Sequence, residues 1–267
     1  MTSNSQLLTN VDHMRPGFLI AALVALVATA SCGSDGAARD DAAPADVTVF
    51  AAASLTAAFT ELGDAFTAAN PGADVTFSFA GSSELVAQLR EGAPADVFAS
   101  ADLANMVALT DADLVDGEPD VFATNTAEII VEAGNPRGIT GVADLAKDDL
   151  VVLQCAPEVP CGAYAEQVLA NAGVTVTPSS LEQNVKAVVT KVLLGEADAG
   201  IVYRTDVLAA GDGADGVAIP DDVNVAAEYP IALVADAPDP RGGRAFIDFV
   251  LSAAGTQILA DAGFGPV

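Results

Sequence analysis

The sequence predicts an α/β protein of two lobes, each with a mainly parallel sheet flanked by helices. From residue 46 onward, short β-branched runs alternate with helical patterns, which is typical of successive strand–helix–strand units. Two such sets follow one another, and the second begins after residue 127. The 267 residues lie near the length at which a single core stops growing, so the length alone allows one large domain or two lobes. The two successive sets predict two lobes, and the lack of a short repeat excludes a solenoid.

The first set contains three expected strands and the helices between them. Its first strand covers 46–50, and the helix after it ends at Asn70, before a Pro-Gly pair. The apolar stripe of that helix has spacings of four, three and four residues and consists of Leu55, Phe59, Leu62 and Phe66. Further strands are expected at 73–79 and 96–99, each followed by a helix start.

The second set and the end of the chain continue the same alternation. Expected strands lie at 128–131, 150–153, 199–203 and 229–234. Expected helices lie at 142–147, 164–172, 185–194, 241–251 and 255–262. The run GDGADG at 211–216 matches the glycine spacing of dinucleotide-binding loops, but no strand precedes it and its aspartates would repel a pyrophosphate. We therefore interpret it as a turn.

The N-terminus has the pattern of an export signal. Arg15 precedes an apolar run at 18–28 that is too short to span a bilayer comfortably, and small residues then lead to Cys32. Small residues directly before a cysteine are typical of lipoprotein signals, so we expect 1–31 to be removed and the cysteine to carry lipid. An ordinary secretory signal is the alternative, and Met14 is an alternative start.

Beyond the signal, the chain has features of a tethered and exported body. The segment 32–45 begins with the lipidated cysteine and is rich in small, charged and Pro/Gly residues, which suits a flexible tether. Once Cys32 carries lipid, Cys155 and Cys161 remain, six positions apart. In an oxidising compartment, an even number of remaining cysteines favours a disulfide between them, and two buried free thiols are the alternative.

The composition excludes several classes of protein. There are 37 acidic and 10 basic residues, a formal charge of −27, so no basic patch is available to bind nucleic acid. A hydrophobic fraction of 52% with only 18% charged residues indicates a folded body. The single histidine, His13, lies within the expected signal, so the processed chain lacks Ser-His-Asp catalysis and histidine-containing zinc sites.

Two serines stand where an expected strand leads into a helix. Ser54 follows the first strand and Ser82 follows the second. A helix start presents unpaired N–H groups and a partial positive charge, and open α/β sheets bind ligands at this end of their strands. Neither serine has an acidic partner three residues on, so neither start has a capping box. The pair predicts an anion site, and simple N-capping by each serine is the alternative.

Three longer motifs carry a family resemblance. The runs VTVFAAASLTAAF at 47–59, FSFAGSSELVAQLREGAPADVFASAD at 77–102 and EADAGIVYRTD at 196–206 resemble periplasmic molybdate-binding proteins, the substrate-binding components of ATP-driven molybdate importers. The resemblance extends over about residues 46–267. It implies a type II periplasmic-binding-protein fold with two crossover strands at the hinge. Lobe one would comprise 46–125 plus 231–267, and lobe two would comprise 126–230.

The resemblance also implies a binding site in the cleft between the lobes. The matching positions comprise two serine hydroxyls, two backbone N–H donors and one tyrosine hydroxyl, namely Ser54, Ser82, Cys161, Val185 and Tyr203. No metal ligand and no charged counter-ion are expected, because molybdenum is held only through its oxygens. Three departures stand out: a cysteine where the family usually has a small residue, Glu84 in the first turn of a helix, and Arg204 next to the tyrosine.

The expected function is capture of molybdate outside the cytoplasm, with no enzymatic activity and no cofactor. We expect a monomer that contacts the membrane only through its lipid anchor, on the outer face of the cell membrane or in the periplasm. Its partners would be an ABC permease and the ATPase of that importer. Tungstate or sulfate is the alternative ligand, and an exported phosphate-ester enzyme or a passive surface lipoprotein is the alternative class. The absence of a G-x-S-x-G elbow and of a mature histidine argues against the enzyme.

Overall fold

The structure is a computed structural model of the chain, and it describes residues 46–267. The expected signal peptide at 1–31, the alternative start Met14, the lipidated Cys32 and the tether at 32–45 lie outside the described residues. Within 46–267, no helix is both long and apolar enough to cross a membrane.

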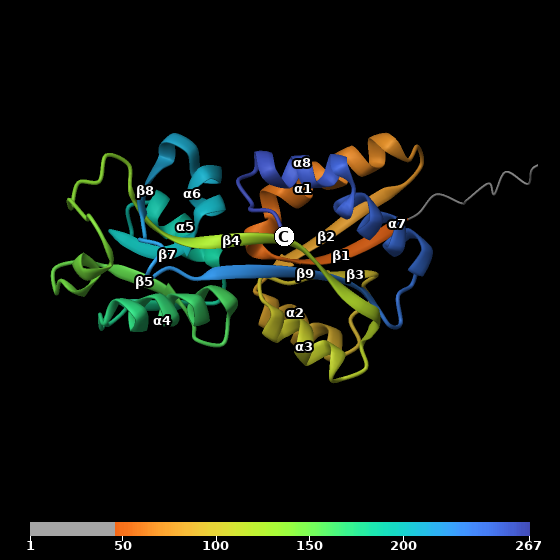
Figure 1. Cartoon of the computed structure of the whole chain (residues 1–267), viewed down its shortest axis with the longest axis horizontal. Helices are drawn as coiled ribbons and strands as arrows, with labels where there is room; N and C mark the ends of the chain where they lie inside the picture. Colours follow the sequence, from red (N-terminus) through yellow and green to blue (C-terminus); the bar gives the residue numbers. More distant parts are fainter. Residues whose placement is uncertain (1–45) are drawn as a thin grey trace, which may run out of the picture. The chain divides into compact units, whose positions relative to one another are not determined.

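Lobe A is built on three parallel strands, with β1 lying between β2 and β3. Its strands are β1 (Asp46–Ala52), β2 (Asp74–Ala80) and β3 (Val97–Ala99). Its helices are η1 (Ala53–Leu55), a single 3-10 turn, and α1 (Thr56–Ala69), α2 (Ser82–Arg90), α3 (Leu103–Thr110), α7 (Pro240–Leu251) and α8 (Ala253–Asp261). Figure 1 shows α1 and α8 on one side of this sheet and α2 and α3 on the other.

Lobe B repeats this plan, with the parallel strand β5 between β6 and β7. Its strands are β5 (Val152–Cys155), β6 (Ser180–Glu182), β7 (Ala199–Tyr203) and β8 (Ala214–Ala218). Its helices are the 3-10 turns η2 (Val142–Ala146) and η3 (Gly211–Gly213), and α4 (Pro160–Ala172), α5 (Val185–Leu193) and α6 (Arg204–Ala210). The strand–helix alternation predicted for residues 128–203 is therefore present.

Two long strands connect the lobes, β4 (Val115–Glu132) and β9 (Ala226–Val234). β4 pairs with β9 along its first part and with β7 and β8 from Ala127 onward, while β9 also pairs with β3. Figure 1 shows β4 and β9 running side by side between the lobes. All antiparallel pairs in the described residues involve one of these two strands. The fold is thus the predicted α/β class with two crossover strands, and its sheet is mixed where they pair.

Several local predictions agree with the structure, and one is wrong. The predicted stripe of α1 is buried along its whole length, and Phe59 makes tilted or edge-on contacts with Phe77, Phe122 and Phe246. The interpretation of 211–216 as a turn fails in its second half, because β8 begins at Ala214 and pairs with β4. Gly216 lies in that strand, where a side chain would collide with Glu128.

Candidate ligand-binding site

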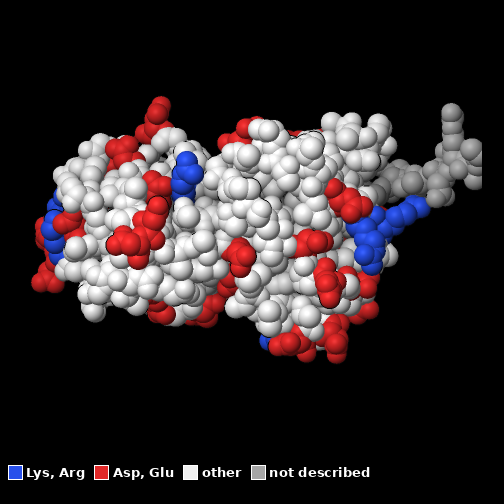
Figure 2. All heavy atoms as spheres, in the orientation of Figure 1, with Lys and Arg blue, Asp and Glu red and all other residues white. Residues whose placement is uncertain are grey.

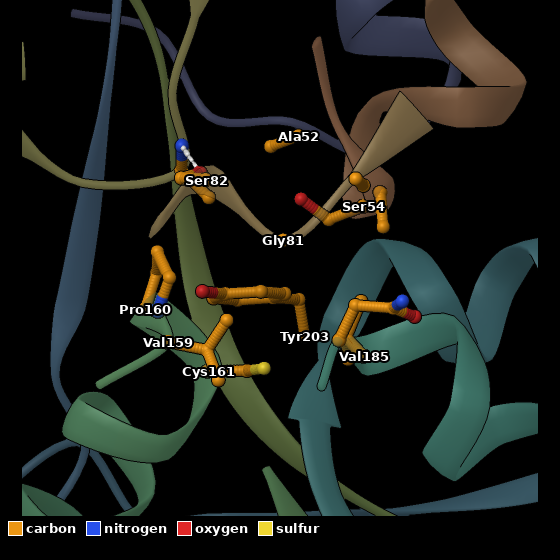
Figure 3. Close-up of a pocket in the computed structure, with 13 residues that line it drawn as sticks. Ala52, Ser54, Gly81, Ser82, Val159, Pro160, Cys161, Val185 and Tyr203 are labelled. Carbon is orange, nitrogen blue, oxygen red and sulfur yellow. Dashed lines mark hydrogen bonds between the residues drawn. The ribbon is translucent and has the colours of Figure 1, made fainter. Parts of the chain in front are cut away.

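A small cavity lies between the two lobes, at the ends of strands from both. Its volume is about 10 Å³, which is about the minimum that holds one water molecule. It is lined by all five residues that the sequence and the family resemblance singled out, Ser54, Ser82, Cys161, Val185 and Tyr203. Figure 3 shows the two serines on the lobe A side, facing the tyrosine and the start of α4 on the lobe B side.

The lining contains no charged side chain among the described residues, although the protein as a whole is strongly acidic. Figure 2 shows Asp and Glu side chains scattered over the surface of both lobes. Glu84 and Arg204, the two charges that the sequence placed near the site, are exposed and do not line the cavity. A bound anion would therefore be neutralised by hydrogen-bond donors and helix dipoles, without a counter-ion.

Four helical segments begin at the cavity. η1 leads into α1 at Ser54, α2 begins at Ser82, α4 begins next to Cys161, and α5 begins at Val185. The N–H groups in the first turn of each helix have no partner inside the helix, and the dipole adds partial positive charge. Converging helix starts from two lobes are an arrangement that can hold a small anion.

The two serine side chains do not cap their helices. No side-chain cap is present at the start of η1, α1 or α2, so the alternative of simple N-capping does not hold. The Ser54 hydroxyl lies 3.0 Å from the Tyr229 hydroxyl, and the Ser82 hydroxyl accepts a hydrogen bond of 3.1 Å from the backbone N–H of Ala101. Each hydroxyl is thus held by a hydrogen bond to another residue of lobe A or of a crossover strand.

Tyr203 is the last residue of β7, and its side chain is buried between the lobes. Its ring contacts the rings of Tyr164 and Tyr229 edge-on. Its hydroxyl oxygen is buried and has no hydrogen-bond partner among the described residues. Burial raises the pKa of this phenol well above its ordinary value, so the group stays protonated and can donate. An unpaired buried donor beside the cavity fits a ligand that accepts hydrogen bonds.

A disulfide links Cys155, at the end of β5, to Cys161, at the start of α4, with their Cα atoms 5.7 Å apart. The loop inside this link is tight. The Val159 N–H donates to the Ala156 carbonyl, and a Cβ at Gly162 would collide with that same carbonyl. The start of α4 is therefore held firmly at the cavity wall.

A buried ion pair supports the lobe B side of the cavity. The Lys186 ammonium lies 2.9 Å from Oδ1 of Asp206, whose side chain is fully buried, and this is the only polar partner of that oxygen within 46–267. Burial raises the pKa of Asp206, and the ammonium opposes this rise. The other oxygen accepts a bond of 3.3 Å from the Tyr203 N–H. Asp206 thus connects Lys186, which follows the cavity residue Val185, to the backbone of Tyr203.

Sequence reasoning missed this ion pair and also missed Tyr229. A lysine in the first turn of a helix is unfavourable to the helix dipole, and this was the available signal for a buried partner. No comparable local signal identifies Tyr229. The described residues contain no group of three or more His, Cys, Asp or Glu side chains that could hold a metal ion.

The uncharged cavity, enclosed by two lobes that two strands connect, defines a solute-binding protein of the type II periplasmic class. Family comparison is more specific. The model for bacterial extracellular solute-binding proteins matches residues 47–265, and the chain belongs to this family. It is accordingly a binding protein that acts outside the cytoplasm and not an enzyme.

Three similar proteins illustrate this membership. The chain is 44% identical over 250 residues to the molybdate-binding protein ModA of Mycobacterium tuberculosis, covering 92% of this chain and 94% of that protein. The periplasmic molybdate-binding protein of Azotobacter vinelandii has a TM-score of 0.72 at 19% identity, covering 82% and 98%. The sulfate-binding protein SubI of M. tuberculosis has a TM-score of 0.76 at 21% identity, covering 84% and 87%. The predicted fold class and family resemblance are confirmed.

Proposed function

We propose that the protein captures molybdate in the cavity between its lobes and delivers it to the permease and ATPase of an ABC importer. The observation that carries this proposal is a cavity lined only by uncharged residues, among them three whose hydroxyl groups can donate hydrogen bonds. The hydroxyls of Ser54, Ser82 and Tyr203 would hold the anion from three sides. The backbone N–H groups of Cys161 and Val185, at helix starts, would complete the shell.

The donor-only shell suits a fully deprotonated dianion. Molybdate accepts hydrogen bonds and donates none, and bonds from neutral donors to a charged acceptor are stronger than those between neutral groups. Phosphate retains a proton near neutral pH and requires an acceptor, and the lining within 46–267 includes no carboxylate to serve as one. Tungstate shares the charge and shape of molybdate and is the main alternative. Sulfate is the next alternative, since a protein named for sulfate binding has the same fold.

The testing experiment is thermal unfolding of the mature domain with molybdate, tungstate, sulfate and phosphate in separate samples. A ligand at ~100 times its dissociation constant adds about 2.7 kcal/mol of stability, which raises the unfolding midpoint by several degrees. We expect shifts with molybdate and tungstate and none with phosphate. A shift with sulfate alone would identify sulfate as the ligand in place of molybdate. No shift with any of the four anions would contradict the proposal.

The substitutions Ser54→Ala and Ser82→Ala should each weaken molybdate binding by about 1–3 kcal/mol, because each removes one donor to a charged ligand. Isothermal titration calorimetry measures the loss directly. Ser83→Ala is the matched control, since Ser83 is adjacent to Ser82 on α2 but does not line the cavity. Wild-type affinity in both cavity variants would remove these serines from the site.

We further propose that the protein is a monomer whose two lobes move about a hinge formed by β4 and β9. One lobe comprises 46–125 plus 231–267, and the other comprises 126–230. The change of pairing partner within β4 at Ala127 supports a boundary there.

For the N-terminus, which lies outside the described residues, we propose a lipid anchor at Cys32. Incorporation of labelled fatty acid that is lost in Cys32→Ser would be the expected result, and unchanged labelling in that variant would contradict it.

A further inference from the structure

Tyr229 is a fully buried residue of the crossover strand β9 that does not line the cavity but contacts two residues that do, Ser54 through its hydroxyl and Tyr203 through its ring. Its hydroxyl oxygen lies 3.0 Å from the Ser54 oxygen and 3.5 Å from Nδ2 of Asn125, on the other crossover strand. Burial raises the pKa of this phenol far above its ordinary value, so it carries its proton throughout the physiological range. The hydroxyl therefore has one proton to donate and, within the described residues, two hydrogen-bond partners, Ser54 and Asn125.

The direction of the Tyr229–Ser54 bond follows from Asn125. The Asn125 carbonyl oxygen accepts a bond of 3.0 Å from the Thr126 N–H, which fixes the amide so that its nitrogen faces Tyr229. That nitrogen also donates to the Thr205 hydroxyl at 2.8 Å. An amide nitrogen only donates, so the Tyr229 oxygen accepts from Asn125. The proton of Tyr229 is then directed to Ser54.

This direction determines what Ser54 offers to a ligand. A serine hydroxyl has one proton, and a Ser54 oxygen that accepts from Tyr229 keeps its own proton for the cavity. Ser82 has the same arrangement with a different partner, because the Ala101 N–H behind it can only donate. One serine is thus fixed as a donor by the backbone and the other by a side chain.

We propose that Tyr229 is a positioning residue that holds Ser54 as an obligatory hydrogen-bond donor and so makes the site select proton-free oxyanions. This inference rests on the proposed function, since it concerns the selectivity of the same cavity. Without the Tyr229 hydroxyl, Ser54 can rotate and present a lone pair to the ligand. A protonated anion such as hydrogen phosphate would then find an acceptor at the Ser54 oxygen.

The first test is a double-mutant cycle on molybdate affinity, measured by calorimetry. Tyr229→Phe should weaken molybdate binding roughly tenfold in the wild-type background, the size of one hydrogen bond. In the Ser54→Ala background the same substitution should change affinity by less than about twofold, because the group through which Tyr229 acts is absent. Equal losses in both backgrounds would indicate a structural role and overturn the proposal, as would wild-type affinity in Tyr229→Phe.

The second readout is competition by phosphate at neutral pH. Phosphate should displace molybdate more effectively from Tyr229→Phe than from the wild type, and unchanged competition would overturn the selectivity argument. Tyr164→Phe is the matched control, because it removes a phenol hydroxyl from another tyrosine that packs on Tyr203 and has no bond to Ser54. Molybdate binding by the wild type in the same titrations tests the proposed function separately from this inference.

A further variant covers the case in which Tyr229→Phe does not fold. Asn125→Asp keeps the shape of the side chain but replaces the donor with an acceptor, so the Tyr229 proton turns toward residue 125 and Ser54 donates to Tyr229. The cavity then gains a lone pair, and phosphate should again compete more effectively than in the wild type. The same substitution on Ser54→Ala measures the effect of the added charge alone. If phosphate competition rises equally with and without Ser54, the proposal fails.

Discussion

Replacing Lys186 with methionine should lower the free energy of unfolding by about 3–5 kcal/mol at neutral pH, because it leaves the buried carboxylate of Asp206 without its counter-ion. Methionine retains much of the aliphatic bulk of lysine, so the effect is mainly that of the missing charge. Urea unfolding at pH 7 measures the difference. Lys147→Met is the control, since Lys147 pairs with Asp144 at the surface, where an ion pair contributes little.

The loss should depend on pH with a defined sign. Burial raises the pKa of Asp206 in the folded protein, and removing Lys186 raises it further. A carboxyl group with a raised folded pKa favours the folded state below its unfolded pKa, and this contribution is lost as the pH rises through the folded pKa. The difference between the variant and the wild type should therefore be largest at neutral pH and shrink on acidification toward the ordinary range of an aspartate. A difference that is constant with pH would contradict this account.

Tyr203→Phe should weaken molybdate binding by about 1.5–3 kcal/mol while leaving the ligand-free protein at least as stable as the wild type. The two effects have opposite signs for one reason. The Tyr203 hydroxyl is buried without a partner among residues 46–267, so its removal relieves a desolvation penalty in the ligand-free protein and removes a donor from the bound state. Calorimetry and thermal unfolding of the same sample measure both.

The matched control for this variant is Tyr164→Phe, which should leave both affinity and stability close to wild type because Tyr164 does not line the cavity. Two results would contradict the role of Tyr203. One is unchanged molybdate affinity in Tyr203→Phe. The other is a large loss of stability, which would show that the hydroxyl already has a partner in the ligand-free protein.

The sequence predicted the features that depend on neighbours along the chain. The stripe of α1 is visible at helical spacing and is buried as expected, and the strand at 199–203 was predicted with its observed bounds. The first part of β4 was missed, because VDGEPD at 115–120 is polar and becomes a strand only where β9 lies beside it. β6 and β8 were also missed, because each becomes a strand only beside a partner, β5 for β6 and β4 for β8.

The five lining residues were predicted through the family motifs, with serine-to-helix junctions as independent support for two of them. The residues that support the lining residues, Tyr229 and the Lys186–Asp206 pair, were not predicted. Tyr229 and Ser54 are separated by 175 positions, so their hydrogen bond leaves no pattern in the sequence. The partner of Lys186 likewise depends on how α5 packs against α6. The predicted lobe boundaries and the roles of the five lining residues stay predictions until the variants above are measured.

The strand order also constrains how the chain folds. The sheet of lobe B uses strands from one continuous segment, β4 to β8, so it can form as soon as that segment is available. The sheet of lobe A cannot be completed until the end of the chain is available, because Ala99 of β3 pairs with Ile231 of β9. Until β9 arrives, β3 has an apolar edge with unpaired backbone groups, which is a site for aggregation. Such distant pairing slows folding, so an exported chain remains vulnerable until nearly all of it has crossed the membrane.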